Sequence, residues 1–231
     1  MVIRSVAVVG VTAAMMLSVP AAGAATGFRA HWKFDEVHSS TAVDSSRHHN
    51  DGTNVHIVGD GTGYTFNGVN SRVVVPSSAS LNPGSADFSY GVTLTMTKPP
   101  SPVGETYDVL RKGLSTSKGG DYKLEVKNIK GNAVPRCVVR SVRANGTKVF
   151  ASIQATRKTL ADGQPHIVKC SKTRTEISIA VGSRPVRTKT YAQGLGSVSN
   201  TFQLAIGAKA ESSAATGFDW YDGMISNAWV R

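Results

Sequence analysis

Residues 200–207 read NTFQLAIG, and residues 218–231 read FDWYDGMISNAWVR. In the first piece, Phe202, Leu204 and Ile206 alternate with polar or small residues, which predicts a strand with one buried side. A loop of small residues follows. The second piece predicts a closing strand that carries Trp229. The end of the chain is therefore expected to form two strands.

Alternation of apolar residues recurs along the chain before this ending. The strongest run covers residues 88–96, and similar runs cover 122–126, 149–153 and 177–181. Turn signals rich in glycine, asparagine and proline separate them, and no segment has a long 3.6-residue apolar period. The pattern predicts an all-β antiparallel sandwich with very little helix, in one domain.

Short motifs in a fixed order accompany these strands. They are HWKFDE (31–36), DSS (44–46), NDGT (50–53), YTFNG (64–68), VVVPSSASL (73–81), LRKG (110–113) and DGQPHIVKC (162–170). With the ending, they resemble the LamG-like jelly-roll domains of the concanavalin A-like lectin/glucanase superfamily. The resemblance implies a jelly-roll sandwich of two antiparallel sheets, in which the closing strand pairs near the opening one.

The first residues have the pattern of a secretory signal peptide. Arg4 gives a positive start, residues 6–19 are apolar or small, and Ala22 and Ala24 frame a cleavage signature. An apolar run of about 14 residues is too short to span a bilayer. We therefore expect a signal peptide at 1–24, a LamG-like domain at 25–231, and a secreted, extracellular monomer with no membrane span.

The two cysteines, Cys137 and Cys170, are expected to form a disulfide. An even number of cysteines in an exported chain favours pairing, and two cysteines alone are too few for a metal site. Closing this loop should add about 3–4 kcal/mol to stability in the chain-entropy model.

The formal charge of +11 is strongly basic and attracts polyanions. The cations are scattered, as in Arg136, Arg140 and Arg143, with no dense run. We expect a glycan or an anionic cell-envelope polymer as partner, and no specific recognition of nucleic acid.

Catalytic patterns are missing from the sequence. Glycosidases need two carboxyl groups about 5–10 Å apart, but Glu125 has Lys123 and Lys127 as its neighbours on one strand face. Asp35 and Glu36 are adjacent and would point to opposite faces of a strand. There is also no nucleophile elbow, P-loop or dinucleotide fingerprint. We expect no enzymatic activity, with a glycoside hydrolase of the same superfamily as the alternative.

The resemblance also implies a calcium site between the opening and closing strands, with Asp35 and Asp44 as candidate ligands. Relatives usually end in Gly-x-Ile-Asp-Glu, whereas Ser226 and Asn227 stand at the two acidic positions here. Loss of carboxylate charge should weaken a calcium site. The alternative is that Asp35 and Asp44 cap turns or accept backbone hydrogen bonds.

Sugar recognition needs aromatic rings flanked by polar groups. Tyr107, Trp220 and Tyr221 are the candidate exposed rings, with Asp219 and Asp222 beside the last two. The alternative is that strand alternation buries one ring of each pair and that Trp229 belongs to the core. We predict a non-catalytic module that binds carbohydrate or a cell-envelope polymer, with a protein–protein adhesion or surface-structural module as a further alternative.

Overall fold

The computed structural model describes residues 1, 27–102, 104–156, 159–184, 186–209 and 219–231. Apart from Met1, the expected signal peptide at 1–24 lies outside these residues. Among them, no helix is long and apolar enough to cross a membrane. The elements are β1 (Ala30–Trp32), β2 (Thr41–Ala42), β3 (Gly52–Val55), β4 (Val58–Gly59), β5 (Tyr64–Asn67), β6 (Arg72–Val75), η1 (Ala79–Leu81), β7 (Phe88–Thr95), β8 (Thr106–Lys112), β9 (Asp121–Ile129), β10 (Asn132–Val142), β11 (Lys148–Gln154), β12 (His166–Lys172), β13 (Glu176–Val181), β14 (Arg187–Thr190), β15 (Leu204–Ile206) and β16 (Asp222–Val230).

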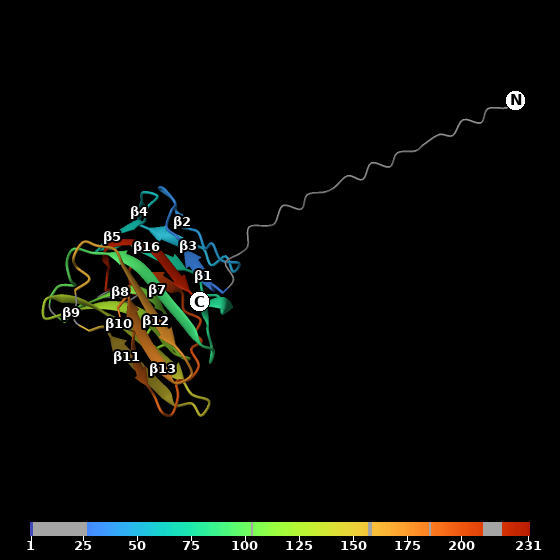
Figure 1. Ribbon diagram of the computed structural model, residues 1–231, viewed down its shortest axis with the longest axis vertical. Helices are drawn as coiled ribbons and strands as arrows, with labels where there is room; N and C mark the ends of the chain where they lie inside the picture. The colour runs from blue at the N-terminus through green and yellow to red at the C-terminus, as the bar shows by residue number, and fades with distance from the viewer. Residues whose placement is uncertain (2–26, 103, 157–158, 185, 210–218) are drawn as a thin grey trace.

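The strands form two eight-stranded antiparallel sheets, one in front of the other in Figure 1. The first sheet has the order β14-β13-β12-β7-β16-β5-β4, with β1 paired to β16. The second has the order β11-β10-β9-β8-β15-β6-β3-β2. The predicted all-β sandwich of two antiparallel sheets is confirmed.

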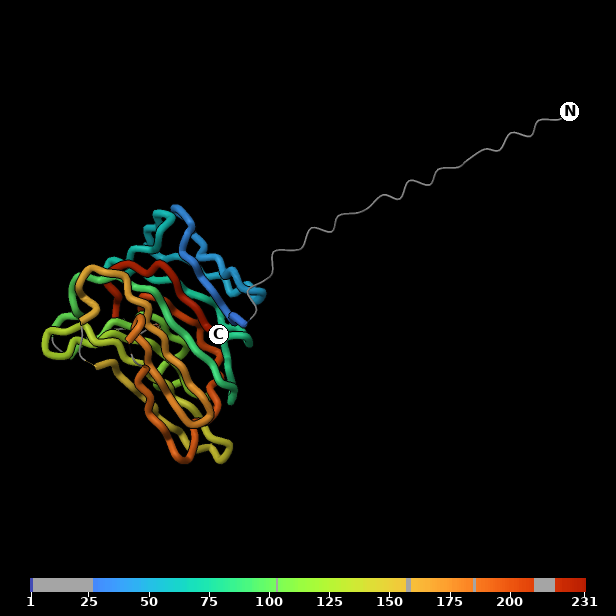
Figure 2. The backbone as a smooth tube through the Cα atoms, in the orientation of Figure 1, coloured from blue at the N-terminus to red at the C-terminus, as the bar shows by residue number. Residues whose placement is uncertain are grey.

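The opening and closing strands lie side by side. Ala30 of β1 pairs with Val230 of β16, and Trp32 pairs with Ala228. Figure 2 shows the blue and red ends of the tube running along each other. This pairing agrees with what the family resemblance implied for residues near the two ends.

Apolar side chains that alternate along β7 and β9 fill the space between the sheets. Tyr90 of β7 and Tyr122 of β9 are fully buried, and their ring centroids are 5.0 Å apart. The Tyr90 hydroxyl is satisfied within the core, because it lies 3.1 Å from the backbone oxygens of Lys123 and Val138. The core therefore accommodates large polar rings without an unpaired hydroxyl at this position.

The predicted disulfide is present and links the two sheets. Cys137 lies on β10 of the second sheet and Cys170 on β12 of the first, with their Cα atoms 5.6 Å apart. Both residues are fully buried. The bond therefore crosses the core and holds the two layers together.

The strand predicted from residues 200–207 is shorter than expected. β15 begins at Leu204, so Phe202 precedes it, and Ala205 is buried together with Leu204 and Ile206. β15 lies between β8 and β6, where Ala205 pairs with Arg111. The strand is thus buried on both sides.

Candidate functional site

Three of the predicted binding residues meet at one hollow. Tyr107 lies on β8, and Asp219 and Trp220 come just before β16. The Asp108 amide donates a hydrogen bond of 2.8 Å to the Asp219 carbonyl, which holds the two segments together. Tyr107, Asp219 and Trp220 line a hollow of about 320 Å³, here called the aromatic hollow.

Neighbouring side chains hold the two aromatic rings in place. The Arg72 guanidinium lies over the Trp220 ring, 5.5 Å from its centroid, at a distance typical of a cation–π contact. The Tyr107 ring meets the Tyr221 ring edge to face at 5.8 Å. Tyr107 and Trp220 are both partly exposed. The hollow therefore presents two restrained aromatic surfaces.

Asp219 is an unusual residue in this hollow. Its φ of 50° lies in the left-handed region, which residues other than glycine seldom adopt. Burial raises the pKa of its carboxyl group, and the negative charge of Asp108 raises it further. Asp219 thus adds a half-buried acidic residue to the lining of the hollow, and a carboxyl group can form hydrogen bonds with hydroxyl groups of a ligand.

Tyr221 and Asp222 occupy different environments from those expected. Tyr221 is fully buried, and its hydroxyl donates to the Thr95 carbonyl at 2.8 Å. The prediction of an exposed Tyr221 ring is therefore wrong, because alternation turns this residue toward the core, where its ring supports Tyr107. Asp222 forms an ion pair with Lys98 at 2.7 Å.

The candidate calcium ligands Asp35 and Asp44 have different surroundings. Asp44 is buried, and its Oδ1 accepts hydrogen bonds of 2.8 Å from the amides of His31 and Ser46. Its Oδ2 accepts from the Ser46 hydroxyl at 2.8 Å and the Asn50 amide at 2.7 Å. Asp35 is exposed. Four protein donors take up the acceptor capacity of the Asp44 carboxylate, so it does not fit a calcium ligand in this arrangement.

The closing strand contributes no acid at this position. Asn227 instead lies with its Oδ1 atom 3.2 Å from Nε2 of His31 on β1. Within the described parts of the chain, no three His, Cys, Asp or Glu side chains are grouped to hold a metal ion.

Carboxylates on the second sheet are matched by cations. Asp108 of β8 lies opposite Glu125 of β9, as a pair of catalytic acids would. The ion pairs are Asp108–Arg111 (2.7 Å), Asp108–Lys123 (3.0 Å), Glu125–Lys123, Glu125–Arg136 (3.2 Å) and Asp121–Arg140 (2.9 Å). The cations contact the oxygen atoms that would have to reach a substrate. The arrangement is therefore that of a buried ion-pair network.

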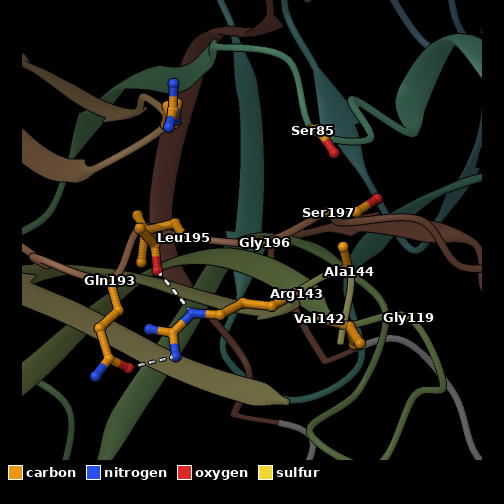
Figure 3. Close-up of a pocket in the computed structure, with 11 residues that line it drawn as sticks. Ser85, Gly119, Val142, Arg143, Ala144, Gln193, Leu195, Gly196 and Ser197 are labelled. Atoms are coloured by element: carbon orange, nitrogen blue, oxygen red, sulfur yellow. Dashed lines mark hydrogen bonds between the residues drawn. The ribbon is translucent and has the colours of Figure 1, made fainter. Parts of the chain in front are cut away.

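A second hollow, of about 590 Å³, contains Arg143 and Arg174 and is called the basic cleft. Figure 3 shows Arg143 running along it, where Nε donates to the Gly194 carbonyl at 3.1 Å and a terminal nitrogen donates to Oε1 of Gln193 at 3.0 Å. None of the described residues that line it is acidic. The sequence did not reveal this cleft, because its lining comes from segments far apart in the chain.

Trp229 does not lie in the core, where the alternative to the sugar-binding hypothesis would place it. Its neighbours Ala228 and Val230 are fully buried, whereas Trp229 is only partly buried. Strand alternation therefore places the indole on the outer face of the first sheet. A β-bulge between Ile225 and Asn227 shifts the phase of this alternation, which the sequence pattern alone does not show.

Solved structures share this fold at low sequence identity. The binding domain of Paraclostridial Mosquitocidal Protein 1 matches with a TM-score of 0.59 and 15% identity over 87% of this chain and 48% of that chain. The binding domain of Botulinum Neurotoxin DC in complex with SialylT matches with a TM-score of 0.57 and 9% identity over 89% and 47%.

A sialidase also shares the fold. Trypanosoma rangeli sialidase in complex with sialic acid matches with a TM-score of 0.55 and 17% identity, over 87% of this chain and 30% of that chain. The chain thus spans between about a third and a half of these structures. Searches with family models and among curated proteins found no match. The likenesses establish the β-sandwich fold and nothing finer.

Proposed function

We propose that this protein is a secreted, non-catalytic module of the LamG-like type that binds carbohydrate. The observation that carries the proposal is the aromatic hollow, which Tyr107, Trp220 and Asp219 line together. A sugar presents an apolar ring face and a rim of hydroxyl groups. Aromatic rings can pack on the first, and a fixed carboxyl group can bind the second.

The fold and its cross-link support the remaining parts of the proposal. The pairing of β1 with β16 is the arrangement that the motif resemblance implies for a LamG-like domain. The Cys137–Cys170 disulfide suits an oxidising, extracellular setting. One structure of the same fold is a toxin binding domain in complex with SialylT, which makes a saccharide a reasonable class of ligand to test.

A non-catalytic role is favoured over glycoside hydrolysis by the ion-pair network. A hydrolase needs one carboxyl group that can give a proton and another that can act as base or nucleophile. Asp108 and Glu125 are opposite each other, but both are held by cations and both are buried. Their burial and ion pairs are typical of residues that stabilise a fold and do not suit a catalytic acid or base.

Affinity electrophoresis in gels that each contain one soluble polysaccharide tests the proposal. The parent protein should be retarded in at least one gel, and Tyr107→Ala and Trp220→Ala should each weaken binding about tenfold or more. Phe150→Ala is the matched control, because it removes a 51% exposed aromatic ring on β11 away from the hollow. Undiminished retardation of both hollow variants would contradict the assignment of the site.

An anionic cell-envelope polymer is a second candidate ligand, and the basic cleft favours it. Arg143 is held in place by Gln193 and the backbone of Gly194, so its charge is positioned in advance. Binding there should weaken steeply with salt. A double variant that carries Arg143→Gln and Arg174→Gln should also bind the polymer more weakly. Stacking in the aromatic hollow should be much less sensitive to salt. Measuring affinity at increasing salt concentration therefore distinguishes binding in the basic cleft from binding in the aromatic hollow.

A further inference from the structure

The outer face of the first sheet carries a further hollow of about 360 Å³, which shares none of its lining residues with the aromatic hollow. Strand pairing places one residue from each of four strands in a row across it. From β12 to β7, β16 and β1, the row consists of Lys169, Gly91, Trp229 and His31. At about 4.8 Å between strands, the row is about 14 Å long, enough for more than one sugar ring.

The Trp229 indole lies against the backbone of Gly91. A Cβ atom added to Gly91 would lie 2.5 Å from Cζ2 and 3.0 Å from Cε2 of Trp229. The indole therefore extends from β16 over β7, in the direction of Lys169. The absence of a side chain at position 91 is what allows the ring to rest on the sheet, and the rest of its surface lines the hollow.

The next row adds apolar and hydrogen-bonding groups. It consists of Ile167, Thr93 and Asn227 on β12, β7 and β16. Ile167 is 53% exposed, so its aliphatic side chain is accessible on this face. Together, Ile167 and Trp229 give the hollow an apolar floor, and Thr93 provides a hydroxyl group.

A fixed polar rim borders this floor. Nε2 of His31 lies 3.2 Å from Oδ1 of Asn227, and burial lowers the pKa of its imidazole, which favours the neutral ring. A neutral imidazole has one donor and one acceptor nitrogen. Phe28 stacks on His31 at 4.5 Å, and the Arg231 guanidinium lies over Phe28 at 4.5 Å. The rim is therefore ordered before any ligand arrives.

We propose that this face, here called the Trp229 platform, binds an uncharged pyranose ring of a polysaccharide. The ring stacks on the indole, and its hydroxyl groups bind the His31–Asn227 pair on one side and the Lys169 amine on the other. The inference takes its class of ligand from the proposed function, but the site is separate. A single aromatic floor with hydrogen-bonding groups at both edges matches a flat sugar with equatorial hydroxyl groups.

A purely structural role for Trp229 is the competing explanation, because a large ring can cover a cross-strand glycine and stabilise a sheet. Such a role predicts a loss of stability on truncation without a change in saccharide affinity of the folded protein. Binding and thermal unfolding must therefore be measured on the same variants.

Affinity electrophoresis at high salt, in separate gels of xylan, mannan, galactan and laminarin, provides the test. The parent should be retarded in at least one gel, Trp229→Ala should lose about tenfold or more in affinity, and Trp229→Tyr should retain part of it. Phe150→Ala should behave as the parent. In Trp220→Phe, which retains Trp229 and the buried Trp32, the same polysaccharide should change the tryptophan fluorescence.

Three results would overturn the platform. They are equal affinity of folded Trp229→Ala and the parent, retardation by none of the four polymers, and binding confined to acidic polymers and abolished by salt. If Trp229→Ala binds normally while Tyr107→Ala does not, the platform fails and the proposed function stands. If Tyr107→Ala binds normally while Trp229→Ala does not, the result supports the Trp229 platform and contradicts the aromatic hollow as a binding site.

Discussion

Asp44 shows how one buried carboxylate can organise a segment of irregular chain. It accepts hydrogen bonds from the amides of His31, Ser46 and Asn50, so it joins β1 to the turn that follows. Hydrogen bonds to a charged acceptor are among the strongest in proteins. At this position the protein itself supplies hydrogen-bond donors to both carboxylate oxygens, and a cation would have to displace them.

Asp44→Ala should therefore lower the free energy of unfolding by about 3 kcal/mol, since buried amides lose a charged partner. Urea unfolding measures the change. Asp35→Ala is the control, and its exposed position predicts a change within about 0.5 kcal/mol. Equal effects of the two substitutions would show that Asp44 does not have this role.

We also propose that calcium adds nothing to the stability of the fold at this position. Because a ligand that binds only the native state raises the unfolding midpoint, the thermal midpoint should be the same with millimolar calcium and with EDTA. A rise with calcium in the parent that disappears in Asp44→Asn would mean that Asp44 exchanges its protein donors for the ion.

The residues of the aromatic hollow show what the sequence can and cannot predict. Tyr107, Asp219 and Trp220 were identified as candidates from their residue types, and the structure brings them together. Tyr221 was a candidate exposed ring but is buried, as the alternative reading of alternation expected for one ring of each pair, whereas Trp229, which that alternative placed in the core, is partly exposed. A side chain changes face with every residue, so a start one position later or a single bulge reverses the assignment.

At the scale of elements, the two sheets are joined by one covalent bond between β10 and β12. Cys137 and Cys170 are separated by 33 positions in sequence. Replacing both with alanine should lower the free energy of unfolding by about 3–4 kcal/mol, because the unfolded chain regains loop entropy. Guanidinium unfolding of the double variant measures this. A reductant should destabilise the parent by a similar amount and leave the variant unchanged. A variant as stable as the parent would contradict this account of the cross-link.

The ion pairs of β8, β9 and β10 make a second prediction at this scale. Asp108 is fully buried between Arg111 and Lys123, so Asp108→Asn leaves buried cations without their partner and should cost about 3–5 kcal/mol. The pair of the half-buried Asp222 with the exposed Lys98 is the control, and Asp222→Asn should cost less than about 1 kcal/mol. Similar costs in denaturant unfolding would show that burial does not decide the strength of these pairs.

The positions of the strands were easier to predict from the sequence than the ion-pair network formed by their side chains. Alternation in residues 122–126 identified β9 and the buried Leu124 and Val126 correctly. The opposite face of the same strand holds Lys123 and Glu125, which the sequence placed together as neighbours. Their partners Asp108 and Arg136 come from adjacent strands, and only strand register determines such contacts.

At the scale of the whole molecule, buried titratable groups should give stability a maximum in alkaline solution. Burial lowers the pKa of Lys112 to about 8, from an ordinary value of 10.5. Between these values the unfolded chain binds more protons than the native one, so the free energy of unfolding rises with pH. Burial raises the pKa of Tyr90 and Tyr122 above 10, so above pH 10 the unfolded chain loses its protons first and stability falls.

Urea unfolding at a series of pH values tests this expectation. The midpoint concentration should rise from pH 8 to about pH 9.5 and fall at higher pH. Lys112→Met should flatten the rise, because it removes the group that titrates in this window. An equal rise of the midpoint in Lys112→Met would contradict the role of Lys112. The rise would then come from the decreasing net charge of a chain whose formal charge is +11.

The central claim is that this sandwich binds a polysaccharide and leaves it intact. The most direct measurement combines affinity electrophoresis on a panel of polysaccharides with an assay for new reducing ends in whichever polymer retards the protein. We expect retardation by at least one polymer, weaker retardation of Trp220→Ala, and no release of reducing ends. Retardation by none of them, or release of reducing ends that Glu125→Gln abolishes, would contradict it.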